Sequence, residues 1–209
     1  MRLPTFWGGI HPPQNKDLTV NEEIESYELV FPMAQNLGAP CSPVVAKGER
    51  VLVGTRLGNN DAFVSAPILS SVSGTVKDVT MRMTTPGMLE NCVVVENDGL
   101  YETAPEWKPL ENYESADPKE YIKRIREAGI VGFGGATFPT AVKLSPPPDK
   151  KINWLIVNGV ECEPYLNCDN RLMLEGAEKV IKGLQLVMRI FPEAKGVIAI
   201  ENNKPQAIS

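Results

Sequence analysis

Three glycines in the second half of the chain could bring the backbone against a ligand. Gly132, Gly134 and Gly135 stand in a Gly-Phe-Gly-Gly segment, and Lys143 follows a short distance on. Because glycine has no side chain, backbone N–H groups can approach phosphate oxygens here, and the lysine adds a full positive charge. The spacing differs from the six-position dinucleotide fingerprint, and the segment follows an expected helix rather than a strand. A plain tight turn is therefore the alternative interpretation.

Two aromatic side chains flank these glycines at positions 133 and 138. A phenylalanine ring can form a flat wall against the ring of a ligand, and it can equally pack inside a hydrophobic core. The sequence leaves both interpretations of Phe133 and Phe138 open.

A second polar set follows two apolar runs nearer the end of the chain. The run at 152–157 leads into Asn-Gly-Val-Glu-Cys-Glu-Pro-Tyr at 158–165, and the run at 196–200 leads into Glu-Asn-Asn-Lys-Pro at 201–205. We expect both runs to be parallel strands, which places the polar segments beyond their carboxyl ends, where open sheets bind ligands. A solvated loop edge is the alternative.

The acids of this second set favour the heterocycle of a ligand over its phosphate. Glu161 and Glu163 would repel phosphate oxygens, and they suit ribose hydroxyls, ring N–H groups or a nicotinamide amide. The glycines and Lys143 would then hold a phosphate, while the loop from Asn158 to Tyr165 would hold the heterocycle. The sequence predicts that these separated turns converge into one crevice that suits a mononucleotide.

The elements around these segments predict an α/β domain. Asp117 can cap a helix that begins at Pro118. An apolar strand at 152–157, an amphipathic helix at 170–190 and a strand at 196–200 make one βαβ unit. Because two parallel strands and one helix cannot cover both faces of a sheet, we expect the chain to be a piece cut inside a larger α/β domain.

The first half of the chain is typical of an all-β domain. Short β-branched runs are separated by turn residues, and they lie at 44–54, 63–67, 74–79 and 92–96. Many short strands with turns between them indicate a small barrel or sandwich. We therefore divide the chain into a β domain at 1–105, a polar linker at 106–116 whose Trp107 and Tyr113 pack on a neighbouring surface, and the start of an α/β domain at 117–209.

Composition excludes several classes of protein. The 209-residue chain carries a formal net charge of −5, so it is a poor general binder of nucleic acid or anionic lipid. No apolar run approaches the roughly 18 residues that cross a bilayer, and the first residues carry no apolar signal core, so we expect the protein in the cytoplasm. The cysteines make no CxxC pair, which predicts free thiols rather than a zinc or iron–sulfur site, and they are Cys41, Cys92, Cys162 and Cys168.

Two runs of the second half resemble the flavin subunit of respiratory complex I. They are GIVGFGGATFPT at 129–140, with Lys143 after it, and NGVECEPY at 158–165, although Thr137 stands where that subunit has glycine. The whole chain is more similar still to the N-terminal part of the RnfC/RsxC subunit of the Rnf family of electron transport complexes. It matches that family in order at 6–13, 38–40, 64–67, 73–76 and 201–205.

This resemblance implies a barrel-sandwich hybrid domain of the lipoyl and biotinyl type, followed by a truncated Rossmann-like α/β domain that binds FMN and NADH. It implies a subunit on the cytoplasmic side of the membrane that takes a hydride from NADH onto FMN. Two [4Fe-4S] clusters in a missing C-terminal part would pass the electrons on towards ferredoxin, while other subunits of the membrane complex translocate ions. The chain would thus be part of an NADH dehydrogenase, inactive by itself.

The resemblance also implies which residues hold the cofactors. No residue is implied as an acid–base catalyst, because FMN carries the chemistry and the protein positions it. The implied contacts to flavin or NADH are Gly132, Gly134, Gly135, Ala136, Phe138, Lys143, Asn158, Glu161, Glu163, Glu201, Asn202, Asn203 and Lys204.

The sequence is compatible with two other functions. The first half resembles biotinyl and lipoyl carriers at 45–51 and 66–76, but the tip at 68–72 reads Ile-Leu-Ser-Ser-Val and has no lysine to modify. A docking or structural module is therefore the better interpretation of that half than a carrier. For the whole chain, the alternative is a non-catalytic docking or assembly module of the same kind of membrane complex.

Overall fold

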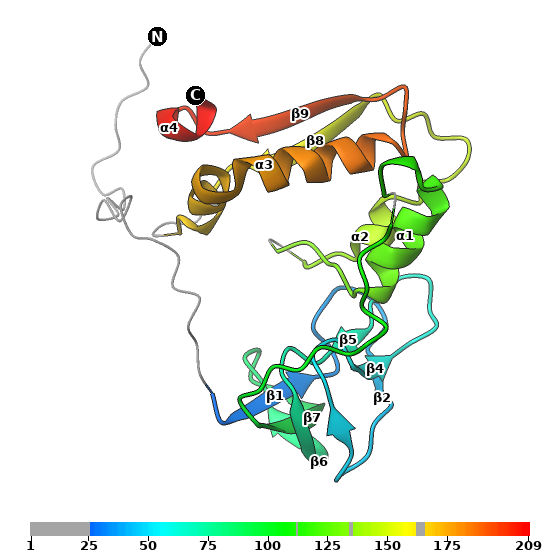
Figure 1. Cartoon of the computed structure of the whole chain (residues 1–209), viewed down its shortest axis with the longest axis vertical. Helices are drawn as coiled ribbons and strands as arrows, with labels where there is room; N and C mark the ends of the chain where they lie inside the picture. Colours follow the sequence, from blue (N-terminus) through cyan, green and yellow to red (C-terminus); the bar gives the residue numbers. More distant parts are fainter. Residues whose placement is uncertain (1–25, 112, 134–135, 162–165) are drawn as a thin grey trace. The chain divides into compact units, whose positions relative to one another are not determined.

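The computed structural model describes residues 26–111, 113–133, 136–161 and 166–209. These residues form two compact units that divide between Lys150 and Lys151 (Figure 1). The first unit comprises the β domain and the segment that follows it, and the second comprises the βαβ elements. The motif at 6–13 and the predicted contacts Gly134, Gly135 and Glu163 lie outside the described residues.

The described part of the first unit contains seven strands in two facing antiparallel sheets. One sheet has the order β1-β7-β6-β3, with bounds β1 Glu28–Pro32, β7 Leu89–Asn97, β6 Gly74–Met83 and β3 Arg50–Val51. The other has the order β2-β4-β5, with bounds β2 Ser42–Pro43, β4 Arg56–Asn59 and β5 Ile68–Leu69. The runs at 74–79 and 92–96 lie within β6 and β7, which confirms those two predicted strands.

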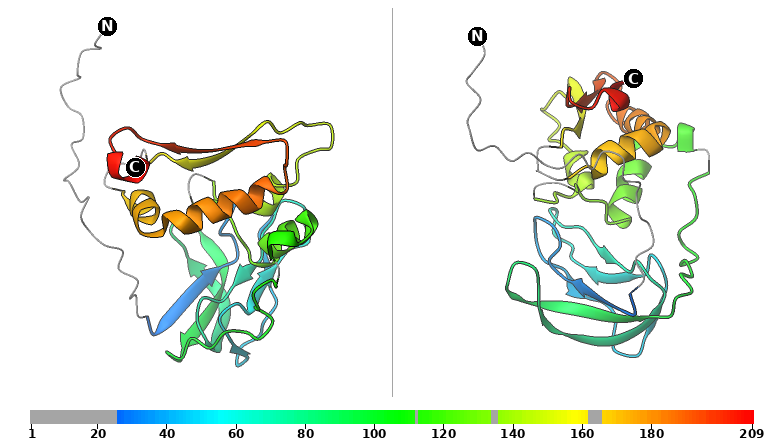
Figure 2. Two further views of the ribbon diagram at one scale, coloured as in Figure 1. Left: turned by 45° about the horizontal axis from the view of Figure 1, so that its top comes forward. Right: turned by 90° about the vertical axis from the view of Figure 1, so that its left-hand side faces the viewer.

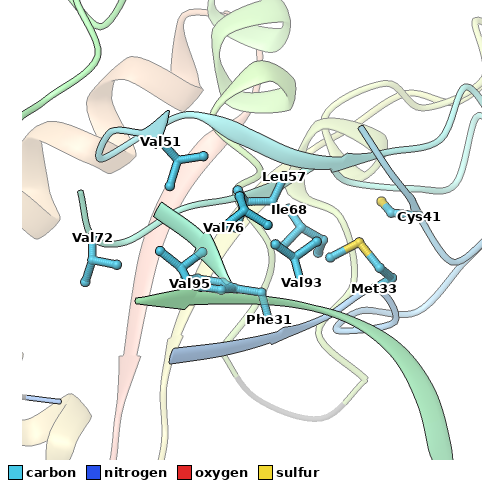
Figure 3. Packing of buried hydrophobic residues seen from close by; sticks show 10 residues of the cluster. All are labelled: Phe31, Met33, Cys41, Val51, Leu57, Ile68, Val72, Val76, Val93 and Val95. Atoms are coloured by element: carbon cyan, nitrogen blue, oxygen red, sulfur yellow. The ribbon is translucent and has the colours of Figure 1, made fainter. Parts of the chain in front are cut away.

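The core of this unit lies between its two sheets. β7 is paired on both edges, and the side chains of Val93 and Val95 alternate with that of Val94; all three are fully buried, so both faces of the sheet are covered at this point. Figure 3 shows the cluster with its side chains pointing toward one another. Its members are Phe31, Met33, Cys41, Val51, Leu57, Ile68, Val72, Val76, Val93 and Val95.

Two expectations for this half are wrong in detail. The run at 63–67 is not a strand, because it forms isolated hydrogen bonds instead of the repeated backbone pairing of a sheet. The Val64 carbonyl accepts from Ala39 N–H at 2.9 Å, and Ser65 Oγ donates to the Ala39 carbonyl at 3.0 Å. The run at 44–54 contributes only the two-residue β3. Strand β1 is an additional strand, and its register is set by β7, more than 60 residues away.

The segment after the sheets packs within the same unit. Trp107 Nε1 donates to the Gly54 carbonyl at 2.9 Å, which confirms the predicted packing of that ring, whereas Tyr113 is 41% exposed. A short 3-10 helix at Tyr113–Ser115 precedes α1, Pro118–Glu127, which begins as predicted, with the Asp117 side chain accepting from Lys119 N–H at 2.8 Å.

Helix α1 ends in a turn that only glycine accepts. Gly129 has a φ of +63°, and an added Cβ there would lie 2.5 Å from the carbonyl oxygen of Pro67. The chain then passes through the glycine-containing loop to α2, Thr140–Lys143. The described part of the predicted α/β domain therefore begins inside the compact unit that holds the two sheets.

The second unit confirms the predicted βαβ order. β8, Trp154–Gly159, pairs in parallel with β9, Lys195–Ile200, and α3, Cys168–Met188, connects them with a kink at Gly176. A four-residue helix, α4, Pro205–Ile208, follows β9. Figure 2 shows α3 running along the two strands. Among the described residues, no helix combines the length and the apolarity that crossing a bilayer requires.

Helix α3 covers one face of this two-stranded sheet. Sulfur and methyl groups of Met173 and Met188 lie where side chains at Gly159 and Gly196 would stand, so these glycines allow close packing of helix on sheet. On the opposite face Ile156 is 65% exposed. The unit therefore buries one side of its sheet and leaves an apolar side open.

Candidate functional site

The loop at 132–138 is closed at its base by backbone pairing. Gly132 N–H donates to the Phe138 carbonyl at 3.0 Å, and Val131 forms an antiparallel bridge with Pro139. Because its N–H is already used, Gly132 contributes space rather than a free donor. An added Cβ at Gly132 would stand 3.1 Å from Lys143 Nζ, so the ammonium lies directly against the bare backbone. The structure thus brings together Gly132, Phe138 and Lys143 as the sequence predicts.

The far side of this loop is fastened to the sheet domain. Leu37 N–H donates to the Ala136 carbonyl at 3.1 Å, and Thr137 Oγ1 donates to the Gln35 carbonyl at 3.1 Å. Thr137 has a φ of +48°, a left-handed conformation that is rare for a β-branched residue. Such a conformation persists only where surrounding contacts hold it, and here the hydroxyl bond to Gln35 is one of them.

The two phenylalanines of the loop have different environments. The Phe133 side chain is fully exposed, at 101%, which excludes the core interpretation for this residue. Phe138 is half-buried next to the closed base of the loop. A role of either ring as a wall for a ligand stays a prediction.

In the second unit, the end of β8 leads directly into a buried ion pair. The Glu161 carboxylate accepts hydrogen bonds from Lys204 Nζ, from Asp169 N–H at 2.7 Å and from Asn170 N–H at 3.4 Å. The side chain of Glu161 is 2% exposed and that of Lys204 is 12% exposed. Because Asp169 and Asn170 belong to the first turn of α3, one carboxylate joins the end of β8, the start of α3 and the loop after β9.

These partners set the charge of the carboxyl group. Burial by itself would raise the pKa of Glu161, but the hydrogen bonds from Lys204 and from Asp169 N–H outweigh burial and lower the pKa below its ordinary value. Burial, followed by the contact with Glu161, raises the pKa of the neighbouring Cys168 thiol. The cluster therefore holds an ionised carboxylate beside a protonated thiol.

The loop after β9 is organised around its own side chains. Asn203 Nδ2 donates to Glu201 Oε2 at 2.9 Å, and Lys204 N–H donates to the Glu201 carbonyl at 3.1 Å. Asn202 is exposed. At the end of β8, the Asn158 side chain accepts from Val160 N–H at 3.1 Å. The carboxyl ends of both strands thus carry the predicted polar side chains, with Glu161 and Lys204 paired to each other.

The cysteines of the described residues are not joined in disulfides. Cys41, Cys92 and Cys168 are free thiols, as predicted for these three. Within the described ranges, Glu161, Cys168 and Asp169 bring possible ligand atoms within 4.8 Å of one another. The Glu161 carboxylate already has a lysine and two backbone donors as partners, so this group does not have the open charge of a cation site.

Two features of the site were missed by sequence reasoning. The backbone donors of Asp169 and Asn170 were not among the candidates, although a helix start shortly after an acidic loop is a usable signal for such a contact. The link from Thr137 to Gln35 joins residues about 100 positions apart and had no signal. The glycine set and the acidic set fall in different units, so their convergence into one crevice stays a prediction.

Buried and accessible side chains alternate at the tip of the β domain. Ile68, Ser70 and Val72 are 6%, 3% and 3% exposed, and the Ser70 hydroxyl donates to the Val72 carbonyl at 2.7 Å. Ser71, between them, is exposed. The missing lysine is therefore the argument against the carrier interpretation.

Comparisons with known proteins identify a domain class for each half. Residues 4–100 match the RnfC barrel sandwich hybrid domain, and residues 125–209 match the Nuo51 FMN-binding domain. The chain therefore joins a barrel-sandwich hybrid domain to an FMN-binding domain of the complex I type. The second match includes both the loop at 132–143 and the strand ends at 158–161 and 201–204.

The curated relatives of the chain are C subunits of ion-translocating oxidoreductase complexes. The chain is 46% identical over 208 residues to the C subunit of the Na(+)-translocating ferredoxin:NAD(+) oxidoreductase complex of Acetobacterium woodii, covering 98% of this chain and 47% of that protein. It is 46% identical over 211 residues to the C subunit of the proton-translocating complex of Clostridium ljungdahlii, covering 99% and 46%. It is 38% identical to the C subunit of an ion-translocating oxidoreductase complex of Haemophilus influenzae, and that match covers 100% of this chain and 33% of the other protein.

The two kinds of match agree with each other. The chain is similar to the N-terminal region of these C subunits, and it matches an RnfC barrel sandwich hybrid domain followed by an FMN-binding domain. It spans about half the length, or less, of these curated relatives.

Proposed function

We propose that this chain is the part of an RnfC-type subunit that binds FMN and receives a hydride from NADH. The observation that carries the proposal is the match of residues 125–209 to the FMN-binding domain, since it contains both predicted sets of cofactor contacts. When bound, FMN supplies the redox chemistry, accepting two electrons at once and releasing them singly. The residues of the chain bind and orient the cofactor.

The donor set fits a phosphorylated flavin. Lys143 Nζ lies against the backbone of Gly132, which places a full positive charge beside the glycine-containing loop. The loop is held in place by the bonds of Ala136 and Thr137 to the sheet domain. We assign phosphate binding to this loop.

The strand ends of the second unit would hold the ring end. Asn158, Glu201, Asn202 and Asn203 offer carbonyl, carboxylate and amide groups that can hydrogen bond a heterocycle or a nicotinamide amide. Glu163 is assigned to flavin or NADH by the family resemblance and lies outside the described residues. The α/β domain is proposed to be Rossmann-like, in keeping with the parallel pair β8–β9 and the connecting α3.

In the longer natural subunit, we propose that the electrons leave through two [4Fe-4S] clusters outside this chain. The names of the relatives describe ferredoxin:NAD(+) oxidoreductase complexes that translocate Na(+) or protons. On that basis the partners are the other subunits of such a complex, with ferredoxin reached indirectly. The place of action is the cytoplasmic side of the membrane, as a peripheral subunit.

A docking or assembly module without a cofactor is the second candidate. The observation that favours it is the outer half of the β6–β7 hairpin, where Met81, Met83, Met88 and Leu89 are between 54% and 68% exposed. Exposed apolar side chains clustered on one hairpin are typical of contact surfaces. This candidate differs from the first because it predicts no flavin binding.

One titration separates these candidates. FMN is added to the purified 209-residue chain and to the longer natural subunit, and binding is followed by the change in flavin fluorescence. The proposal expects binding by the longer subunit, and NADH then reduces the bound flavin. Binding by the shorter chain as well would show that its own loops suffice. Binding by neither would favour the docking module.

A further inference from the structure

The start of α3 lies where α/β proteins commonly bind phosphate. The first turn of a helix that follows a parallel strand presents free N–H groups and the positive end of the helix dipole. Helix α3 is 21 residues long and follows β8, so its first turn has both properties. A phosphate-bearing ligand of this domain could therefore be expected at α3.

In this chain an internal anion already occupies that position. The Glu161 carboxylate accepts from the N–H groups of Asp169 and Asn170 at 2.7 and 3.4 Å, which are the donors that a phosphate would use. Lys204 Nζ, which could serve as the cation beside such a phosphate, donates to the same carboxylate. Because the Glu161 side chain is only 2% exposed, a dissolved anion cannot reach these donors while the carboxylate is in place.

We infer that Glu161 is a specificity-determining residue that fills the anion site of α3 and keeps phosphate away from this end of β8 and β9. This inference rests on the proposed function in one respect: it leaves the loop at 132–143 as the place for the phosphate of the flavin. It gives Glu161 and Lys204 a positioning role, since they act on the ligand through the electrostatics and the fixed conformation of the strand ends.

Removing the carboxylate should convert the start of α3 into an anion site. In Glu161→Ala, two backbone N–H groups and the Lys204 ammonium lose their shared partner at the same time. Buried donors without a partner are costly, so they favour any anion that can enter. A small dianion such as inorganic phosphate fits the chemistry of two N–H donors and one ammonium.

The experiment measures thermal unfolding of the 209-residue chain with and without inorganic phosphate at constant ionic strength. Far-UV circular dichroism follows the unfolding, because α3 is the longest helix of the described chain. Glu161→Ala is expected to unfold at a lower temperature than the parent chain and to regain about 3 °C or more at saturating phosphate. The parent chain is expected to show a smaller shift, because only its loop at 132–143 is proposed to bind phosphate.

Control variants separate this effect from a general loss of charge. Glu178 lies on α3 and pairs with Lys182 in an exposed ion pair, so Glu178→Gln removes one carboxylate without opening the first turn of the helix. It should respond to phosphate like the parent chain. Adding Lys204→Met to Glu161→Ala should abolish at least half of the phosphate shift, because the entering anion loses its cation.

Glu161→Ser covers the case in which Glu161→Ala does not fold. The hydroxyl is smaller than the carboxylate and has no charge, so it leaves room for an anion, and this variant is expected to show a smaller phosphate shift in the same direction. A phosphate shift in the parent chain as large as in the variants would overturn the inference. A folded variant with no phosphate shift beyond that of the parent chain would overturn it as well.

The outcome is independent of whether the chain binds FMN. A parent chain and a longer subunit that both fail to bind FMN would contradict the proposed function and leave the phosphate result unchanged. FMN binding together with no phosphate shift beyond that of the parent chain in both Glu161 variants would contradict this inference and leave the proposed function in place.

Discussion

The two units are stabilised in different ways. In the sheet domain, β7 is paired on both edges and its valines at 93, 94 and 95 are fully buried. In the βαβ unit, α3 covers one face of the sheet, while Trp154 and Ile156 on the other face are 55% and 65% exposed. The second unit instead has a polar contact with little exposure, the ion pair between Glu161 and Lys204.

This difference indicates where each unit is sensitive to change. Apolar burial contributes roughly 25 cal/mol for each Å² removed from water, so a closed core gains stability from many side chains together. An ion pair taken out of water gains little net stability, but removal of one partner leaves the other charge buried and alone. We therefore expect the β domain to depend on packing and the βαβ unit to depend strongly on one pair of charges.

The largest effect is expected at the ion pair. Glu161→Gln should lower the free energy of unfolding of the βαβ unit by about 3 kcal/mol, because Lys204 stays buried without its counter-charge. Denaturant unfolding followed by the signal of α3 measures this loss. In Glu161→Gln combined with Lys204→Met the loss should be smaller than the sum of the two single losses. Additive losses would show that the two side chains do not interact.

The same ion pair predicts that the free energy of unfolding decreases at acid pH. The pKa of Glu161 is lower in the folded chain than its unfolded value of about 4.3, so its stabilising contribution is complete above that unfolded value. The contribution is lost as the pH falls through the folded pKa. A pH series of unfolding should show this loss in the parent chain, and Glu161→Gln should flatten it. An equal loss of stability at acid pH in the variant would contradict the assignment of this loss to Glu161.

A matched pair of valines tests the packing side of the comparison. Val93 is 0% exposed in β7 and Val197 is 37% exposed in β9. Val93→Ala should cost about 2 kcal/mol, because two buried methyl groups are removed and a cavity is left. Val197→Ala should change stability by at most about 0.5 kcal/mol. Equal costs at the two sites, measured by chemical denaturation, would remove the distinction between a closed and an open sheet.

The smallest effect concerns the helix that follows the sheets. Asp117→Ala removes the side-chain acceptor for Lys119 N–H and should destabilise the first unit by about 1 kcal/mol. Asp149→Ala is the matched control, because its carboxylate forms only an exposed ion pair with Lys150. Thermal unfolding of the two variants should differ by a few degrees. Identical midpoints would indicate that α1 does not need this cap.

Local signals in the sequence predicted the local structure well. Asp117 and Pro118 define the start of α1 by themselves, since a cap and a first-turn proline act within three residues. The apolar runs at 152–157 and 196–200 correspond to β8 and β9, and the parallel pairing follows from the helix between them. In each case the energy that decides the structure comes from neighbours along the chain.

Features that depend on distant partners were not predictable in the same way. Strand β1 exists because Glu28–Pro32 finds β7, and the run at 63–67 remains irregular because no strand pairs with it in a ladder. The sequence indicated Glu161 and Lys204 as separate cofactor contacts. Their mutual bond joins positions 43 residues apart and depends on the alignment of β8 with β9. Such pairings require the assembled fold.

The measurement that tests the central claim most directly compares FMN with riboflavin, which has the same ring system and no phosphate. Both are titrated into the longer natural subunit, and into the same protein with Lys143→Met. The account predicts that FMN binds at least about tenfold more tightly than riboflavin, and that Lys143→Met removes most of this difference, since a charge-assisted bond to phosphate contributes roughly 1.5–3 kcal/mol. Equal affinity for the two flavins, or a preference for FMN that survives Lys143→Met, would contradict it.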